Sequence, residues 1–187
     1  MSKPTRSATW NVYPPQLGMW VFLSTITMLF AAFSSAYIIR RAAADWVQIS
    51  LPAILWVNTV VLAASSLGLE SARSSLDKGR HVTAARWVGL TILLGLVFLA
   101  GQLAGWRELA QQGVFVPTSP HSSFFYILTG LHGLHVVGGL AFLSVTSARV
   151  AGGGDVIHLA RLVRLCATYW HFLLSLWIFV FLVLALL

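Results

Sequence analysis

Charged residues are scarce in this chain of 187 residues. Lys, Arg, Asp and Glu together make up 9% of the sequence, and only five of them are acidic. A soluble domain carries about 25% charged residues, so the composition excludes an ordinary soluble fold. The single cysteine, Cys166, excludes an intrachain disulfide and any metal motif built from several cysteines. Hydrophobic residues make up 58% of the sequence.

The seventeen charged side chains lie at the edges of five neutral runs, each at least 20 residues long. An α-helix needs about 20 apolar residues to cross a bilayer, and the alternating pattern of a membrane β-barrel is missing from the sequence. We therefore expect an all-α, polytopic membrane bundle that forms a single domain over residues 1–187. The five predicted transmembrane helices span about 17–41, 51–74, 83–107, 121–149 and 162–187.

The basic residues predict an orientation, because five crossings place the two termini on opposite sides. Nine Lys and Arg residues fall on the side of the N-terminus and of the loops near 70–86 and 149–164, against three on the other side. Cytoplasmic segments carry such an excess, which predicts a cytoplasmic N-terminus and a periplasmic C-terminus. We interpret the net charge of +7 as this topology signal. Binding to nucleic acid is disfavoured, because the basic residues are split over three short segments.

No Asp, Glu, Lys or Arg is expected well inside a span, but His132, His135 and His171 are. A pump or transporter that works alone generally needs a buried ionisable relay, so that class is disfavoured. His132 and His135 share a helix face and could join His171 in a three-histidine metal site. With no carboxylate expected in the spans to orient a ligand, hydrogen bonds to neighbouring helices or lipid headgroups are favoured instead.

Glycines are frequent in the histidine-bearing helix and in the helix expected before it. Gly130, Gly133, Gly138 and Gly139 accompany the histidines, and Gly101 and Gly105 form a GxxxG pair. Small residues let membrane helices approach closely, so these glycines predict tight packing. At the start of the fourth helix, before Pro120, either Thr118 or Ser119 is expected to be the N-terminal cap.

Five segments resemble, in order, the helices of subunit III of haem–copper terminal oxidases such as cytochrome c oxidase. The segment 121–139, HSSFFYILTGLHGLHVVGG, matches the family signature FF-x-x-TG-x-HG-x-HV-x-x-G. The other matches are LGMWVFLSTITMLFAAFSSAYIIR at 17–40, NTVVLAASSLGLESAR at 58–73, LLGLVFLAGQLAGW at 93–106, and YWHF at 169–172 with Trp177 after it. The resemblance covers nearly the whole chain and fits the short, five-helix bacterial form.

The resemblance implies an accessory subunit in the bacterial inner membrane that holds no haem, copper or catalytic residue of its own. Its partners would be oxidase subunits I and II, membrane phospholipids and a larger respiratory supercomplex. Subunits I and II carry the haem and copper and reduce O₂ with electrons from cytochrome c. The expected contribution is assembly, stability and lipid binding. The residues expected to fix the bundle or contact lipid are His132, His135, Trp170, His171, Arg86, Gly130 and Gly133.

The sequence departs from the family pattern in two places. Thr25 and Ile26 stand where the family often has Ser-Glu, and Leu174 stands where it often has Asp. The loss of both acids favours a scaffold or lipid role over proton handling. Two alternatives stay open: a subunit III-like protein of a nitric-oxide reductase or quinol oxidase, and a small metal-dependent membrane enzyme that uses the three histidines.

Overall fold

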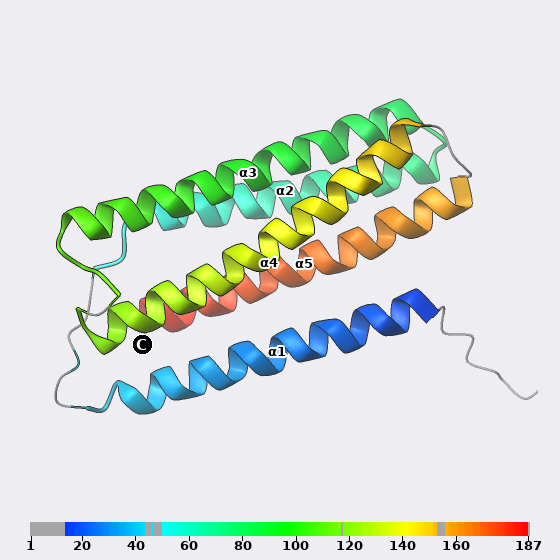
Figure 1. Cartoon of the computed structure of the whole chain (residues 1–187). Helices are drawn as coiled ribbons and strands as arrows, with labels where there is room; N and C mark the ends of the chain where they lie inside the picture. The colour runs from blue at the N-terminus through cyan, green and yellow to red at the C-terminus, as the bar shows by residue number, and fades with distance from the viewer. Residues whose placement is uncertain (1–13, 44–45, 47–49, 117, 153–155, 187) are drawn as a thin grey trace, which may run out of the picture.

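The computed structural model describes residues 14–43, 46, 50–116, 118–152 and 156–186. These residues form five helices and no strand, and each helix is long and apolar enough to cross a membrane. The helices are α1 (Pro14–Arg40), α2 (Ile54–Asp77), α3 (His81–Gln111), α4 (Pro120–Ala151) and α5 (Val156–Leu186) (Figure 1). The all-α, five-span prediction is confirmed, although α5 begins six residues earlier than expected.

Helix α3 shows why several helices are longer than the neutral runs. It contains Arg86 near its start and Arg107 near its end, 21 residues apart. At 1.5 Å per residue this spacing is about 30 Å, which is the thickness of the hydrocarbon core. The two arginines are therefore spaced to reach the two membrane surfaces, and the helix continues beyond each.

Helices α2, α3, α4 and α5 pack in a ring, in which each contacts its two neighbours. Among the described residues, α1 packs against α4 and α5 alone, and Figure 1 shows it lying to one side of the other four. Helices α2 and α4 end, and α3 and α5 begin, at one end of the bundle, whereas α3 ends, α4 begins and α5 ends at the other. Large buried side chains, among them Phe98, Trp170 and Trp177, fill the ring.

The start of α4 is fixed by a capping box. The Ser119 hydroxyl accepts a hydrogen bond from the Ser122 backbone N–H at 3.2 Å, and the Ser122 hydroxyl accepts one from the Ser119 N–H at 3.0 Å. Pro120 follows the cap, where its missing N–H leaves no helical hydrogen bond unmade. Of the two expected caps, Ser119 is the one used.

Two of the glycines lie where α4 closely approaches α5 and α3. A β-carbon at position 139 of α4 would lie 3.0 Å from the rings of Tyr169 and Trp170 on α5, and one at position 95 of α3 would lie 2.8 Å from Leu140. Glycine therefore lets α3, α4 and α5 close around the Trp170 ring, as small residues do in membrane bundles.

Candidate functional site

Polar residues from four of the five family motifs meet inside the ring of α2 to α5. We call this set the buried polar centre, of which Thr59 and Trp106 are only partly buried. It consists of Asn58 and Thr59 on α2, Gln102 and Trp106 on α3, Thr129 and His132 on α4, and Trp177 on α5. Motifs that are far apart in the sequence thus contribute to one place in the fold.

Three side-chain hydrogen bonds tie the helices together here. The Asn58 amide donates to the Phe98 carbonyl at 3.2 Å, and the Trp177 indole N–H donates to the Thr59 hydroxyl at 2.9 Å. The Trp106 indole N–H donates to the Thr129 hydroxyl at 3.1 Å. The three bonds join α2 to α3, α5 to α2 and α3 to α4. Each satisfies a polar group that would be costly to bury unpaired.

His132 lies among aromatic rings at this centre and is fully buried. Its ring centroid is 5.0 Å from that of Trp177 and 5.7 Å from that of Phe98, whose ring meets it edge to face. Neither nitrogen of His132 has a hydrogen-bond partner, and neither do the amide oxygen and nitrogen of the buried Gln102. For His132, the prediction of a hydrogen bond to a neighbouring helix does not match the described contacts.

Trp170 forms a second set of contacts between helices, closer to the end of the ring where α2 ends and α3 begins. Its indole N–H donates to the Ser65 hydroxyl on α2 at 2.9 Å, and the Thr91 hydroxyl on α3 donates to the Ser65 carbonyl at 3.3 Å. The Trp170 ring is fully buried. This tryptophan therefore fills the core and bonds across it, which is consistent with the bundle-fixing role expected of it.

His135 lies where α4 meets α1 and α5. Its Nδ1 bonds to the Leu131 carbonyl of its own helix at 2.7 Å, and its ring packs 5.9 Å from the Phe30 ring of α1. The His135 carbonyl also accepts a hydrogen bond from the Tyr169 hydroxyl on α5 at 3.0 Å. His135 thus joins its own helix, α4, to α1 and α5.

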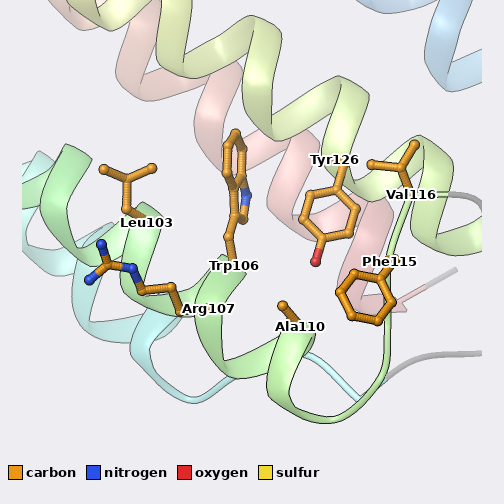
Figure 2. Close-up of a pocket in the computed structure, with 7 residues that line it drawn as sticks. All are labelled: Leu103, Trp106, Arg107, Ala110, Phe115, Val116 and Tyr126. Carbon is orange, nitrogen blue, oxygen red and sulfur yellow. The ribbon is translucent and has the colours of Figure 1, made fainter.

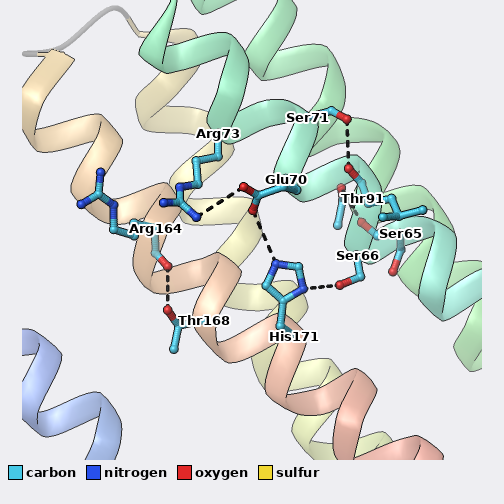
Figure 3. Close-up of polar contacts among 10 residues, drawn as sticks. Ser65, Ser66, Glu70, Ser71, Arg73, Thr91, Arg164, Thr168 and His171 are labelled. Atoms are coloured by element: carbon cyan, nitrogen blue, oxygen red, sulfur yellow. Dashed lines mark hydrogen bonds and ion pairs between the residues drawn. The ribbon is translucent and has the colours of Figure 1, made fainter.

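His171 has two partners on α2, and one of them corrects an expectation from the sequence. Its Nδ1 bonds to the Ser66 hydroxyl, and its Nε2 lies 3.6 Å from a carboxylate oxygen of Glu70, which also pairs with Arg73 at 3.3 Å (Figure 3). The expectation that no carboxylate in the spans would be available to orient a histidine was wrong for His171, because Glu70, which its charge had assigned to the loop near 70–86, lies on α2 beside this ring. Ser66 and Glu70 are four residues apart and share a helix face, a signal the sequence already contained.

The two positions that lack the family's acids have apolar surroundings. Ile26 is 3% exposed and belongs to the hydrophobic core, and Leu174 packs partly buried against that core. The carboxylate that lies beside His171 belongs to Glu70 on α2.

A metal centre is not formed by the three histidines. His132, His135 and His171 each have separate neighbours, and the described residues contain no group of three or more His, Cys, Asp or Glu side chains that could hold a metal ion. The alternative of a three-histidine metal site is therefore wrong for this geometry.

The remaining predicted site residues lie on two helices. A β-carbon at position 130 would lie 3.5 Å from the Trp106 ring, and one at position 133 would lie 3.9 Å from Leu99, so both α4 glycines face α3. Arg86 is the sixth residue of α3, and its side chain is exposed.

The fold and the buried polar centre define a multi-pass α-helical membrane protein whose polar motif residues face inward and join its helices. The sequence profile described as "Cytochrome c oxidase subunit III" matches residues 15–186. The chain belongs to the cytochrome c oxidase subunit III family and is an accessory subunit of a haem–copper terminal oxidase.

Individual relatives agree with the family match. The chain is 33% identical over 171 residues to the "Probable cytochrome c oxidase subunit 3" of Nocardia farcinica, covering 88% of this chain and 84% of the relative. It is 32% identical over 173 residues to the "Cytochrome c oxidase subunit 3" of Alkalihalophilus pseudofirmus, covering 88% and 82%. It is 30% identical over 185 residues to the protein of the same name from Bacillus sp. PS3, covering 95% and 88%.

Proposed function

We propose that this chain is a non-catalytic subunit whose helices α2 to α5 form a scaffold for the redox subunits of the oxidase. One observation carries the proposal: three of the interior tryptophans are used for joining helices. Trp106, Trp170 and Trp177 each donate an indole N–H to a hydroxyl on a neighbouring helix. Polar bonds and close packing hold membrane helices together, so these groups serve the stability of the bundle.

The redox chemistry belongs, on this proposal, to the partners. Subunits I and II would carry the haem and copper, take electrons from cytochrome c, and reduce O₂ to water while conserving energy as a proton gradient. This chain would contribute assembly and stability. The exposed apolar side chains of α1, such as Met28 and Val21, suit contact with lipid or with a partner's transmembrane helices.

The proposed location is the bacterial inner membrane, with the N-terminus in the cytoplasm. Helices α2 and α4 end, and α3 and α5 begin, at one end of the bundle (Figure 1), and that end has the excess of Lys and Arg by sequence. Arg40, Arg41 and Arg107 belong to the opposite end. The positive-inside rule supports placing the basic end in the cytoplasm.

A groove between α3 and α4 supports the expectation of a phospholipid partner. It has a volume of about 320 Å³ and is lined by apolar and aromatic side chains with Arg107 at its edge (Figure 2). The Tyr126 hydroxyl donates to the Val114 carbonyl, and the Trp106 indole N–H donates to the Thr129 hydroxyl. Because both polar groups are already bonded within the protein, the two rings offer apolar surface to an acyl chain. The Arg107 guanidinium suits a lipid phosphate at the membrane surface. Arg86, near the other end of α3, would suit a phosphate of the opposite leaflet.

Copurification tests the proposal. The chain, tagged at its C-terminus and extracted from its native membrane in mild detergent, is expected to bring down a complex with haem absorbance and copper. A haem complex without copper would favour the nitric-oxide reductase alternative, and oxidation of quinol instead of cytochrome c would favour the quinol oxidase. Recovery of the chain alone would contradict all three.

Turnover per assembled complex tests whether the chain is catalytic. Trp170→Ala should lower the amount of assembled complex, because it removes a fully buried ring and an interhelix bond. The turnover of the complexes that do assemble should stay unchanged. Normal assembly with lost turnover would contradict the scaffold role.

A further inference from the structure

Gln102 and His132 are two buried polar residues inside the ring of α2 to α5 whose side chains have no described hydrogen-bond partner. They are 3% and 0% exposed, and all four of their side-chain nitrogen and oxygen atoms lack a hydrogen-bond partner. Their interior neighbours Asn58, Thr129 and Trp177 are all bonded. Buried polar groups in folded proteins are nearly always paired with protein or with ordered water, so these four atoms point to a ligand.

The contacts around the two residues place them in the same region of the α3–α4 junction. Phe98, one turn before Gln102 on α3, packs against the His132 ring at 5.7 Å. Trp106, one turn after Gln102, bonds to Thr129, which precedes His132 by three residues on α4. Residues at this spacing share a helix face. Gln102 therefore lies between two contacts that both join α3 to this part of α4.

The chemistry of the two side chains selects the ligand. The Gln102 amide offers an acceptor oxygen and a donor NH₂ group, and a neutral histidine offers one donor and one acceptor nitrogen. Among the described residues, no Asp, Glu, Lys or Arg side chain is buried, so a bound ion would have no counter-charge in the interior. A small, uncharged molecule that both donates and accepts hydrogen bonds meets these requirements, and buried water typically makes about three such bonds.

We propose that Gln102 and His132 form a buried water site that bridges α3 to α4. The water accepts from one side chain and donates to the other, and thereby adds a polar link to the joint that Trp106 and Thr129 already make. This inference concerns the interior of the chain itself and does not depend on the accessory role of the subunit.

A density map of the intact oxidase complex is the direct test. At a resolution near 2 Å, a water peak should lie within hydrogen-bond distance, about 2.7–3.2 Å, of both the Gln102 amide and a His132 nitrogen. A direct bond between the two side chains, with no peak between them, would overturn the proposal. So would a map in which the two side chains point away from each other.

Thermal dissociation of the complex tests the coupling between the two residues. Gln102→Met and His132→Phe should each lower the midpoint temperature at which this chain leaves the complex. The double variant should lower it by no more than the larger single effect, because both changes remove the same bridge. Gln111→Met and His158→Phe, at exposed positions, are the matched controls and should leave the midpoint unchanged.

Additive effects of the two substitutions, or single variants that match their controls, would overturn the bridge. If Gln102→Met prevents assembly, Gln102→Asn replaces it, since it keeps the amide and shortens the side chain by one carbon. If neither variant assembles, the density map of the unaltered complex decides the matter alone.

Discussion

Gly101 of α3 lies against Asn58 of α2 so closely that a β-carbon at position 101 would be 2.1 Å from Asn58 Oδ1. Asn58 is itself held, because its amide donates to the Phe98 carbonyl one turn before Gly101. The glycine and the asparagine therefore form one joint, in which the missing side chain at one position makes room for the polar side chain at the other.

Gly101→Ala should destabilise the α2–α3 pair. The added methyl group would displace Asn58 and strain its bond to Phe98, and overpacking of this kind costs about 1–3 kcal/mol. The measurement is the midpoint temperature at which this chain dissociates from the purified complex.

Gly89→Ala is the control for this experiment, because Gly89 lies on the same helix and no atom lies within 4 Å of its β-carbon position. Alanine favours a helix interior over glycine by about 1 kcal/mol in soluble helices, so the midpoint should stay the same or rise. Equal losses in the two variants would show that the Asn58 contact is not the cause.

Trp170→Phe should separate the hydrogen-bonding role of Trp170 from its packing role. The phenyl ring keeps much of the buried volume but leaves the Ser65 hydroxyl without its indole donor. Polar bonds between membrane helices contribute about 0.6 kcal/mol on average and at most about 1.7 kcal/mol, and the smaller ring adds a cavity cost.

Ser65→Ala should then have little further effect in the Trp170→Phe background, whereas it should be destabilising in the unaltered chain. Trp20→Phe, at an exposed position on α1, is the matched control for the ring change. Independent effects of Ser65→Ala in both backgrounds would contradict a direct bond in the assembled protein.

The contact of His171 with α2 predicts that substitutions at two serines of this helix have different effects. Ser66→Ala should weaken the α2–α5 joint, because Ser66 is 2% exposed and its hydroxyl bonds to the His171 ring. Ser74→Ala, at an exposed position of the same helix, should have no effect on the dissociation midpoint.

Glu70→Gln should have a smaller effect than Ser66→Ala. The Glu70 and His171 side chains are 49% and 45% exposed, and solvent or headgroups can replace an exposed partner. A larger loss for Glu70→Gln would instead indicate that a partner subunit covers this face and shields the pair from solvent.

The sequence predicted the five helices well, because the positions of charges mark membrane spans strongly. The same signal misled at Glu70: the predicted helix at about 51–74 contained this residue, but its charge assigned it to the loop near 70–86, whereas it lies on α2 beside His171. Long side chains at a membrane boundary can be in the helix and still reach polar surroundings. Boundary charges therefore give the number of helices more reliably than their ends.

The joints between helices were harder to predict than the helices themselves. The Gly101–Gly105 spacing indicated close packing, and the structure places Asn58 against the first glycine and Ile54 and Leu55 against the second. Nothing in the sequence pairs Trp170 with Ser65, which are 105 residues apart. Such pairs depend on how the helices are arranged around the ring, and periodicity within one helix does not contain that information.

The attachment of α1 gives the last prediction. This helix packs against α4 and α5 alone among the described residues, and Phe30 is fully buried in that contact, next to His135. Phe30→Ala should loosen α1 by about 3 kcal/mol, as for a buried phenylalanine in a soluble core, while the ring of α2 to α5 stays intact. Hydrogen exchange of the complex should therefore rise in α1 and stay unchanged in α2 and α3. Met28→Ala, at a position 74% exposed, should leave the exchange of α1 as it was. Faster exchange throughout the bundle would mean that α1 and the ring unfold as one unit.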